Sequence, residues 1–297
     1  MNIGKLIRNH QKNISLVKFL LPALILYCLF VIYPFINGLY YSFTDWDGMS
    51  PDAKWVGLKN YVKILGREDF LGTIYFTVKF TVTTVIMQNV GALLLAVALD
   101  SITSKFRNTL RGVFYIPNIM AQSVVAFIWT FVFTKGFESL YKIFGFEFLN
   151  WSWFGDGTLA FWVIVIVSNW IGTGYLMIIY IAGLQGIPQN FIEASMIDGA
   201  NPIQRFFRIK LPFIMPAFVI GIFSITMYGF RQFDIVFFMT MGKPYGQTET
   251  IAFKIYQTAY DLFKFGESSA QSVVLLLFSV IVTFLEVYYL KKMEVEA

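Results

Sequence analysis

The chain has 297 residues, of which 57% are hydrophobic and only 14% carry a formal charge. With a mean hydropathy of +0.63 it is not an ordinary soluble domain, where about 25% of residues are charged. The single cysteine, Cys28, excludes a disulfide framework and is expected to be a small buried packing residue. The composition therefore predicts an integral membrane protein.

Six apolar runs are long enough to cross a bilayer, whose hydrocarbon core of about 30 Å needs roughly 20 helical residues. The predicted fold class is an all-α integral membrane protein, with six transmembrane helices in one transmembrane domain, residues 1–297. The predicted helices cover residues 19–43, 72–99, 112–133, 159–185, 212–234 and 268–290.

The N-terminal residues 1–18 are basic, and they are too long and too polar for the opening region of a signal peptide. The uncharged run 19–44 lacks a cleavage site of small residues, which favours a retained first helix. His10, the only histidine, is expected to be a solvated surface residue. Lys79, in the second predicted helix, is expected to extend its ammonium to the membrane interface, with a cavity-facing position as the alternative.

A short polar segment within residues 187–211 separates two long uncharged runs. Residues 189–197 can form a helix after Pro188, and Gly199 can take the positive φ that ends a helix. Asn201 is a good N-cap and Pro202 suits the first position of a second helix, which is predicted to reach about Lys210. These signals alone are also compatible with an ordinary loop between helices.

The spacing of residues 193–212 resembles the EAA loop of the permease subunits of ABC importers, with serine at the third position of the motif. The sequence of residues 197–200 is similar to the corresponding sequence in the carbohydrate-uptake branch of this family. Residues 56–61, 115–118 and 242–250 also resemble that branch. In that family the loop forms coupling helices that dock in a groove of a cytoplasmic ATPase. The resemblance implies these ATPase-coupling residues: Glu193, Ala194, Ser195, Asp198, Gly199, Ile209, Leu211 and Pro212.

Charge predicts the orientation. With both termini in the cytoplasm, the cytoplasmic segments are shorter in total than the external ones but hold 12 of the 23 lysines and arginines. This agrees with the positive-inside rule. This places the loop 187–211 in the cytoplasm, as the resemblance requires. The predicted location is the bacterial cytoplasmic membrane, crossed several times. Since the net charge of +5 is explained by this topology, no nucleic-acid partner is inferred.

The sequence contains no GxxxxGK[ST] phosphate loop and no cluster of histidines, cysteines and carboxylates at metal-ligand spacing. The chain is therefore not expected to be an enzyme, and no cofactor or metal is expected in it. The resemblance implies ATP and Mg²⁺ on partner chains. The implied partners are a second permease subunit, two cytoplasmic ATPase subunits, an extracellular or periplasmic substrate-binding protein and membrane lipid.

A substrate pathway is predicted near the end of the fifth helix. Arg231 and Asp234 are three residues apart, so that on a helix they would share a face. Gln232 adds an amide and Tyr228 an aromatic ring, and sugars use such groups. Pairing of the two charges at the membrane interface is the alternative. Asn118 and Gln122, in the third predicted helix, are a second location for the pathway.

The function predicted is the permease subunit of an ATP-driven, binding-protein-dependent importer of a sugar or oligosaccharide. The resemblance is to the first of the two different permease chains of such importers. A glycerol phosphate or a polyol is the alternative cargo. The alternatives from other classes are an ion-driven secondary transporter or channel and a membrane scaffold.

Overall fold

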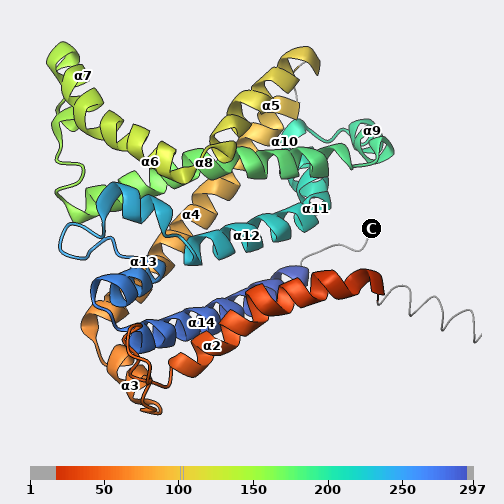
Figure 1. Ribbon diagram of the computed structural model, residues 1–297. Helices are drawn as coiled ribbons and strands as arrows, with labels where there is room; N and C mark the ends of the chain where they lie inside the picture. Colours follow the sequence, from red (N-terminus) through yellow and green to blue (C-terminus); the bar gives the residue numbers. More distant parts are fainter. Residues whose placement is uncertain (1–17, 101, 103, 293–297) are drawn as a thin grey trace, which may run out of the picture. The chain divides into compact units, whose positions relative to one another are not determined.

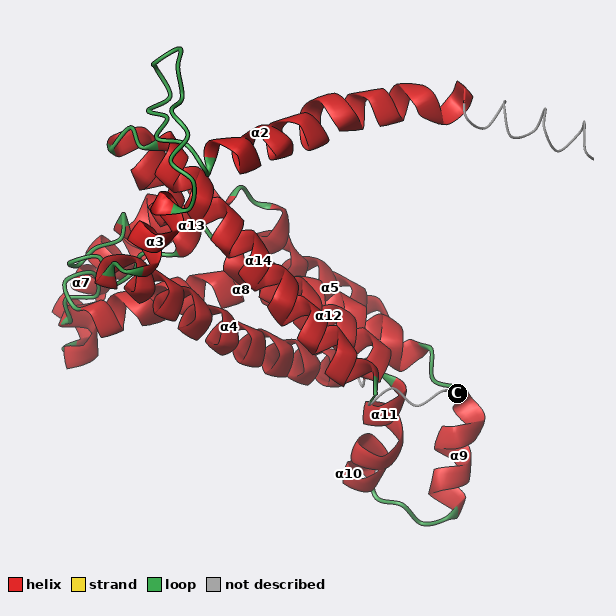
Figure 2. Cartoon of the chain, turned by 90° about the horizontal axis from the view of Figure 1, so that it is seen from below, coloured by secondary structure: helices red, strands yellow, loops and turns green. Residues whose placement is uncertain are grey.

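The computed structural model describes residues 18–100, 102 and 104–292 of the chain, so the predicted basic tail with His10 and both termini lie outside the described residues. Figures 1 and 2 show that the described part is built of helices and loops. One isolated antiparallel bridge joins Thr44 and Trp55. The all-α prediction is thus confirmed for the described residues.

The chain divides into two compact units. Of the described residues, the smaller unit holds those up to Ile64 together with Thr258–Val273, and the larger holds those within Leu65–Gln257 and from Val274 onward. The last long helix, α14 (Phe265–Lys291), is shared between them.

The smaller unit contains the first apolar span, Lys18–Tyr41, which includes a π-helical turn (Cys28–Ile32) and α2 (Tyr33–Tyr41). Cys28 is exposed on this span, so the expectation of a buried packing residue is wrong. The buried Asn60 amide organises the loop that follows, since it donates to the backbone oxygens of Ser42 (3.0 Å) and Thr44 (2.7 Å).

The larger unit is built around two long helices, α4 (Glu68–Asp100) and α8 (Gly157–Gln185), which pack on each other. The buried face of α4 carries threonines one turn apart. Thr77 and Thr81 each donate to the carbonyl oxygen one turn back at 2.7 Å, which satisfies hydroxyl groups that would otherwise be buried without a partner. The helices α5 (Ser104–Ile119) and α12 (Met215–Phe230) pack against this pair.

The third predicted helix, 112–133, is wrong as a single element. The chain forms α5 to Ile119, breaks, and restarts with α6 (Gln122–Phe131), η2 (Val132–Gly136) and α7 (Phe137–Phe144). Pro117 removes a backbone donor inside α5, and Ala121 is extended with φ −60° and ψ 130°. The third apolar span is therefore Gln122–Phe144, which extends beyond the predicted end of the third helix at residue 133.

The fifth predicted helix, 212–234, is also corrected. The segment Pro202–Phe213 meets Met215–Phe230 at an angle of 67°, with the break at Ile214 just before Pro216. Five described helices are long and apolar enough to cross a membrane, and the number is six if the bent pair is counted as one span. Besides Lys18–Tyr41, the unbent spans are Glu68–Asp100, Gln122–Phe144, Gly157–Gln185 and Phe265–Leu290.

A glycine sets the approach of α5 to α8. A Cβ at Gly174 would fall on the backbone carbonyl group of Phe114, so no side chain fits between the two helices at this point. Small residues at such crossings let helix backbones approach closely inside a membrane.

We expect Gly174→Ala to destabilise the protein by about 1–3 kcal/mol, because backbone atoms rather than a flexible side chain would have to move. The measurement is the thermal unfolding midpoint of the detergent-solubilised protein. Gly91→Ala is the matched control, since its Cβ would meet Thr173 Cγ2 at an ordinary 3.5 Å. Equal midpoints for the two variants would contradict the role assigned to Gly174.

Candidate functional site

The polar segment 187–211 has the local structure that its sequence predicts. Helix α9 covers Gln189–Ile197, and Gly199 has a φ of +75°. Asn201 caps α10 (Pro202–Arg205) in a reciprocal capping box, in which Asn201 and Gln204 each accept a backbone N–H of the other, at 2.8 and 2.9 Å. Figure 2 shows α9 and α10, joined by a loop, projecting from one end of the larger unit.

Helix α9 has one face turned outward. Glu193 and Ala194 are exposed, whereas Ser195 is buried and its hydroxyl donates to the Ile192 carbonyl oxygen at 2.6 Å. Ile197 is 86% exposed on the outward face, and Ile203 of α10 is 69% exposed. Apolar side chains exposed together beside an acidic residue are typical of a protein-docking surface. Asp198, also exposed, ends the helix.

A cavity of about 500 Å³, the inner cavity, lies between α9, the π-helical turn η4 (Phe206–Lys210) and the end of α4. Ser195 and Ile209 line it, and so does an ion pair in which Lys210 Nζ lies 3.1 Å from Asp100 Oδ2. Leu211 packs on the apolar core formed by α4, α8 and α12, and Pro212 follows in α11 (Leu211–Phe213). The helical loop is therefore fastened to the transmembrane helices.

We expect Gly199→Val to loosen this loop, since a Cβ at Gly199 meets no atom within 4 Å and the positive φ is the only obstacle. Limited proteolysis should then cut near residues 196–201 several times faster than in the unmodified chain. Gly199→Asn is the control, because asparagine tolerates the left-handed conformation. Equal proteolysis of the valine and asparagine variants would show that the backbone conformation is not what holds the turn.

A second cavity, the middle cavity, has a volume of about 320 Å³ and brings together three of the predicted pathway residues, Asn118, Gln122 and Tyr228. Gln88 of α4 lines it as well, and its amide nitrogen donates to the Ser168 carbonyl oxygen at 2.9 Å. The side-chain oxygens of Gln88 and Gln122 are buried and have no hydrogen-bond partner among the described residues. Buried acceptors without a donor are costly, which points to a ligand or water that supplies donors.

The other predicted pathway residues lie elsewhere. Helix α12 ends at Phe230, so the expectation that Arg231 and Asp234 share a helix face is wrong. Arg231 is exposed, and its Nε donates to the Met227 carbonyl oxygen at 3.2 Å. Gln232 is buried and donates to the Tyr228 hydroxyl at 3.1 Å, which positions that ring at the edge of the middle cavity.

Gln88 is the functional candidate that the sequence analysis missed. It is buried in the middle of α4, within a long run of apolar residues and threonines. An amide at this depth is expensive in a membrane and marks an interior or functional position. That signal was available from the sequence.

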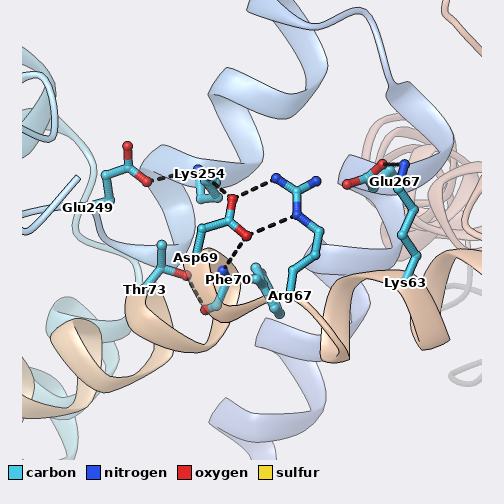
Figure 3. Close-up of polar contacts among 8 residues, drawn as sticks. All are labelled: Lys63, Arg67, Asp69, Phe70, Thr73, Glu249, Lys254 and Glu267. Carbon is cyan, nitrogen blue, oxygen red and sulfur yellow. Dashed lines mark hydrogen bonds and ion pairs between the residues drawn. The ribbon is translucent and has the colours of Figure 1, made fainter. Parts of the chain in front are cut away.

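A third cavity, the outer cavity, has a volume of about 610 Å³ and is lined by the beginnings of α4 and α8, the loop 245–249 and α13 (Ile251–Tyr256). Figure 3 shows the Asp69 carboxylate between Arg67 (2.6 Å) and Lys254 (3.3 Å), with Glu249 3.0 Å from the same Lys254. Lys79 also lines this cavity, with its ammonium 4.2 Å from the centre of the Phe161 ring. This is the cavity-facing position that was the alternative for Lys79.

Among the described residues no group of three or more histidines, cysteines or carboxylates could hold a metal ion.

The chain is similar to known proteins along most of its length. A model of the family described as "Binding-protein-dependent transport system inner membrane component" matches residues 88–295. The probable starch degradation products transport system permease protein AmyD of Thermoanaerobacterium thermosulfurigenes is 37% identical over 280 residues, which cover 94% of both chains. The sn-glycerol-3-phosphate transport system permease protein UgpA of Agrobacterium fabrum is 30% identical, over 91% of this chain and 92% of the relative.

Among solved structures, a chain of a bacterial ABC transporter involved in the import of the acidic polysaccharide alginate has the same fold. The TM-score is 0.82, with 20% sequence identity, over 97% of this chain and 99% of the other.

Proposed function

Because the chain belongs to the family of binding-protein-dependent transport system inner membrane components, we propose that it is a permease subunit of an ATP-driven importer of a sugar or oligosaccharide. The observation that carries the proposal is the pair of short helices α9 and α10, joined by a turn, with Glu193 and Ile197 exposed at one end of the bundle. We assign to it the docking of a cytoplasmic ATPase. ATP and Mg²⁺ would be bound by two such partner chains.

The proposed assembly pairs this chain with a second permease subunit and takes its cargo from an external substrate-binding protein. The chain would cross the cytoplasmic membrane six times, with the bent pair Pro202–Phe213 and Met215–Phe230 counted as one span. Both termini would be cytoplasmic, as the positive-inside rule favours. This orientation puts α9 and α10 within reach of the ATPase.

The geometry connects the segment 187–211, which we call the docking loop, to the middle cavity. The ion pair between Lys210 and Asp100 joins the loop to the end of α4, and α12 follows the loop after the bend at Ile214. Helix α4 contributes Gln88 to the middle cavity and α12 contributes Tyr228. Movement of the loop by the ATPase would therefore shift two walls of that cavity.

The charge reversal Glu193→Lys tests the docking role. The side chain is exposed, so we expect the variant to fold and insert normally but to lose ATPase attachment, because the reversed charge would stand unpaired in the docking surface. Co-purification of the ATPase and transport by the reconstituted importer are measured together. The control is Glu147→Lys, an equal reversal at an exposed residue of the external 3-10 turn Glu147–Asn150.

Wild-type attachment and transport in Glu193→Lys would refute the docking role assigned to Glu193. Transport that persists with no ATPase in the preparation would instead support an ion-driven secondary transporter.

The middle cavity favours a neutral hydroxylated cargo. Its lining offers amide and hydroxyl groups, and among the described residues around it none is a lysine or arginine. The lining amides of Asn118 and Gln122 can exchange hydrogen bonds with sugar hydroxyls, while aromatic rings such as Tyr175 and Tyr228 cover the apolar faces of the sugar. A glycerol phosphate would bring a dianion to a site without a cation, which argues against it.

Gln122→Ala is expected to lower transport at sub-saturating sugar about fivefold to tenfold, the range for one lost hydrogen bond in a closed site. Initial uptake rates by the complete importer with maltose, maltotriose, raffinose and glycerol 3-phosphate measure the effect and identify the cargo class. Arg231→Ala is the comparison, and it should transport normally because Arg231 does not line the cavity.

The reverse pattern, a loss in Arg231→Ala with normal Gln122→Ala, would move the pathway to the end of α12. Uptake of glycerol 3-phosphate alone would establish the alternative cargo.

A further inference from the structure

The outer cavity lies at the end of the larger unit opposite to the docking loop. Helix α8 begins at this cavity, with Gly157 and Thr158, and ends at Gln185 just before α9. Helix α4 likewise begins here and ends at Asp100, which pairs with Lys210 beside the docking loop. If α9 faces the cytoplasm, the outer cavity faces the side from which cargo arrives.

Of the four charged side chains that line the outer cavity, Asp69, Glu249 and Lys254 are paired with one another, and Lys79 lies over the Phe161 ring. Lys254 is held between Asp69 and Glu249, and Arg67 holds Asp69 from the other side (Figure 3). An ionic ligand would have to compete with these pairs. A neutral polyhydroxylated ligand would not, because the carboxylate oxygens keep lone pairs that can accept hydroxyl groups. The lining therefore suits a neutral ligand rich in hydroxyl groups.

Lys79 and the aromatic side chains complete this surface. The Lys79 ammonium faces the Phe161 ring, which leaves hydrogen-bond donors directed away from the ring. Tyr75 lines the cavity and is 70% exposed, and Tyr245 at the edge is 96% exposed. Exposed rings beside hydrogen-bonding groups are suited to the alternating apolar and hydroxylated faces of a sugar ring.

The outer and middle cavities lie along one face of α8. Phe161 lines the outer cavity and Gly172 the middle one, and eleven residues of helix, about three turns, separate them by roughly 16 Å. Ile164 and Ser168, which lie between them on α8, are fully buried. The two cavities are thus separate sites in this structure.

We propose that the outer cavity is a second binding site, for a neutral saccharide, which cargo occupies before it reaches the middle cavity. The proposal rests on the proposed function of the chain and adds a site to it. Lys79 and Tyr75 are its main contacts, and Asp69, Glu249 and Lys254 form its preorganised polar wall.

The test places a reporter inside the cavity. Thr158→Cys is introduced together with Cys28→Ser, because Thr158 lines the cavity, is exposed, and Cys28 is the only native thiol. The complete importer in lipid nanodiscs, without binding protein or nucleotide, is alkylated by a water-soluble maleimide at increasing concentrations of maltotriose. We expect maltotriose to slow alkylation at position 158.

The dependence on the proposed contacts is then measured. Lys79→Ala or Tyr75→Ala should raise the maltotriose concentration for half protection about tenfold, as for loss of one strong contact. Gln122→Ala should leave protection unchanged, because Gln122 lines the other cavity. Lys142→Ala, an exposed lysine of α7, is the control substitution, and Ser139→Cys in place of Thr158→Cys is the control reporter.

Three results would overturn the proposal. Maltotriose uptake with no protection at position 158 would leave the proposed function intact but remove the second site. Protection by glucuronate and not by maltotriose would make it an anion site. Protection by sugar-free binding protein alone would make it a protein-docking surface. If the unmodified importer takes up none of the saccharides tested, the proposed function itself fails.

Discussion

The packing of α4 against α8 is the contact on which the rest of the larger unit depends. Half of the apolar window of α8 is buried inside the protein, against 6% for α14, and both α5 and α12 rest on the α4–α8 pair. The buried Thr77 and Thr81 satisfy their hydroxyl groups within α4 itself, and Gly174 admits the backbone of α5. Because residues of α4 line all three cavities, a displacement of this helix changes the shape of each of them.

The features that the sequence predicted best are those decided by local chemistry. The turn at Gly199 and the cap at Asn201 depend on residues within a few positions of one another, so their structure could be derived without knowledge of the fold. The apolar runs were equally clear, because a run of about twenty apolar residues without charge is typical of a membrane-spanning helix. The ends of helices within such runs were harder to predict. The breaks before α6 and α12 depend on the positions of prolines, which a hydropathy profile does not take into account.

The candidate site was harder to predict because it is assembled from distant segments. Asn118, Gln122 and Tyr228 were each recognised, but the cavity that unites them forms only where α5, α6 and α12 meet α8. The prediction that Arg231 and Asp234 share a helix face assumed a helix that continues to residue 234, whereas α12 ends at Phe230. Gln88 completes the site from α4, and the buried amide oxygens of Gln88 and Gln122 give the site its need for donors.

The neutrality of the middle cavity bears on how a cell keeps its ion gradients while importing nutrients. A bare sodium ion or proton that enters a low-dielectric space needs a carboxylate or several aligned carbonyl groups to replace its water. The described lining provides amides, hydroxyls and rings but no carboxylate. An open cavity of this kind would admit a hydroxylated solute while it disfavours leakage of cations, so each transport cycle would leave the membrane potential intact.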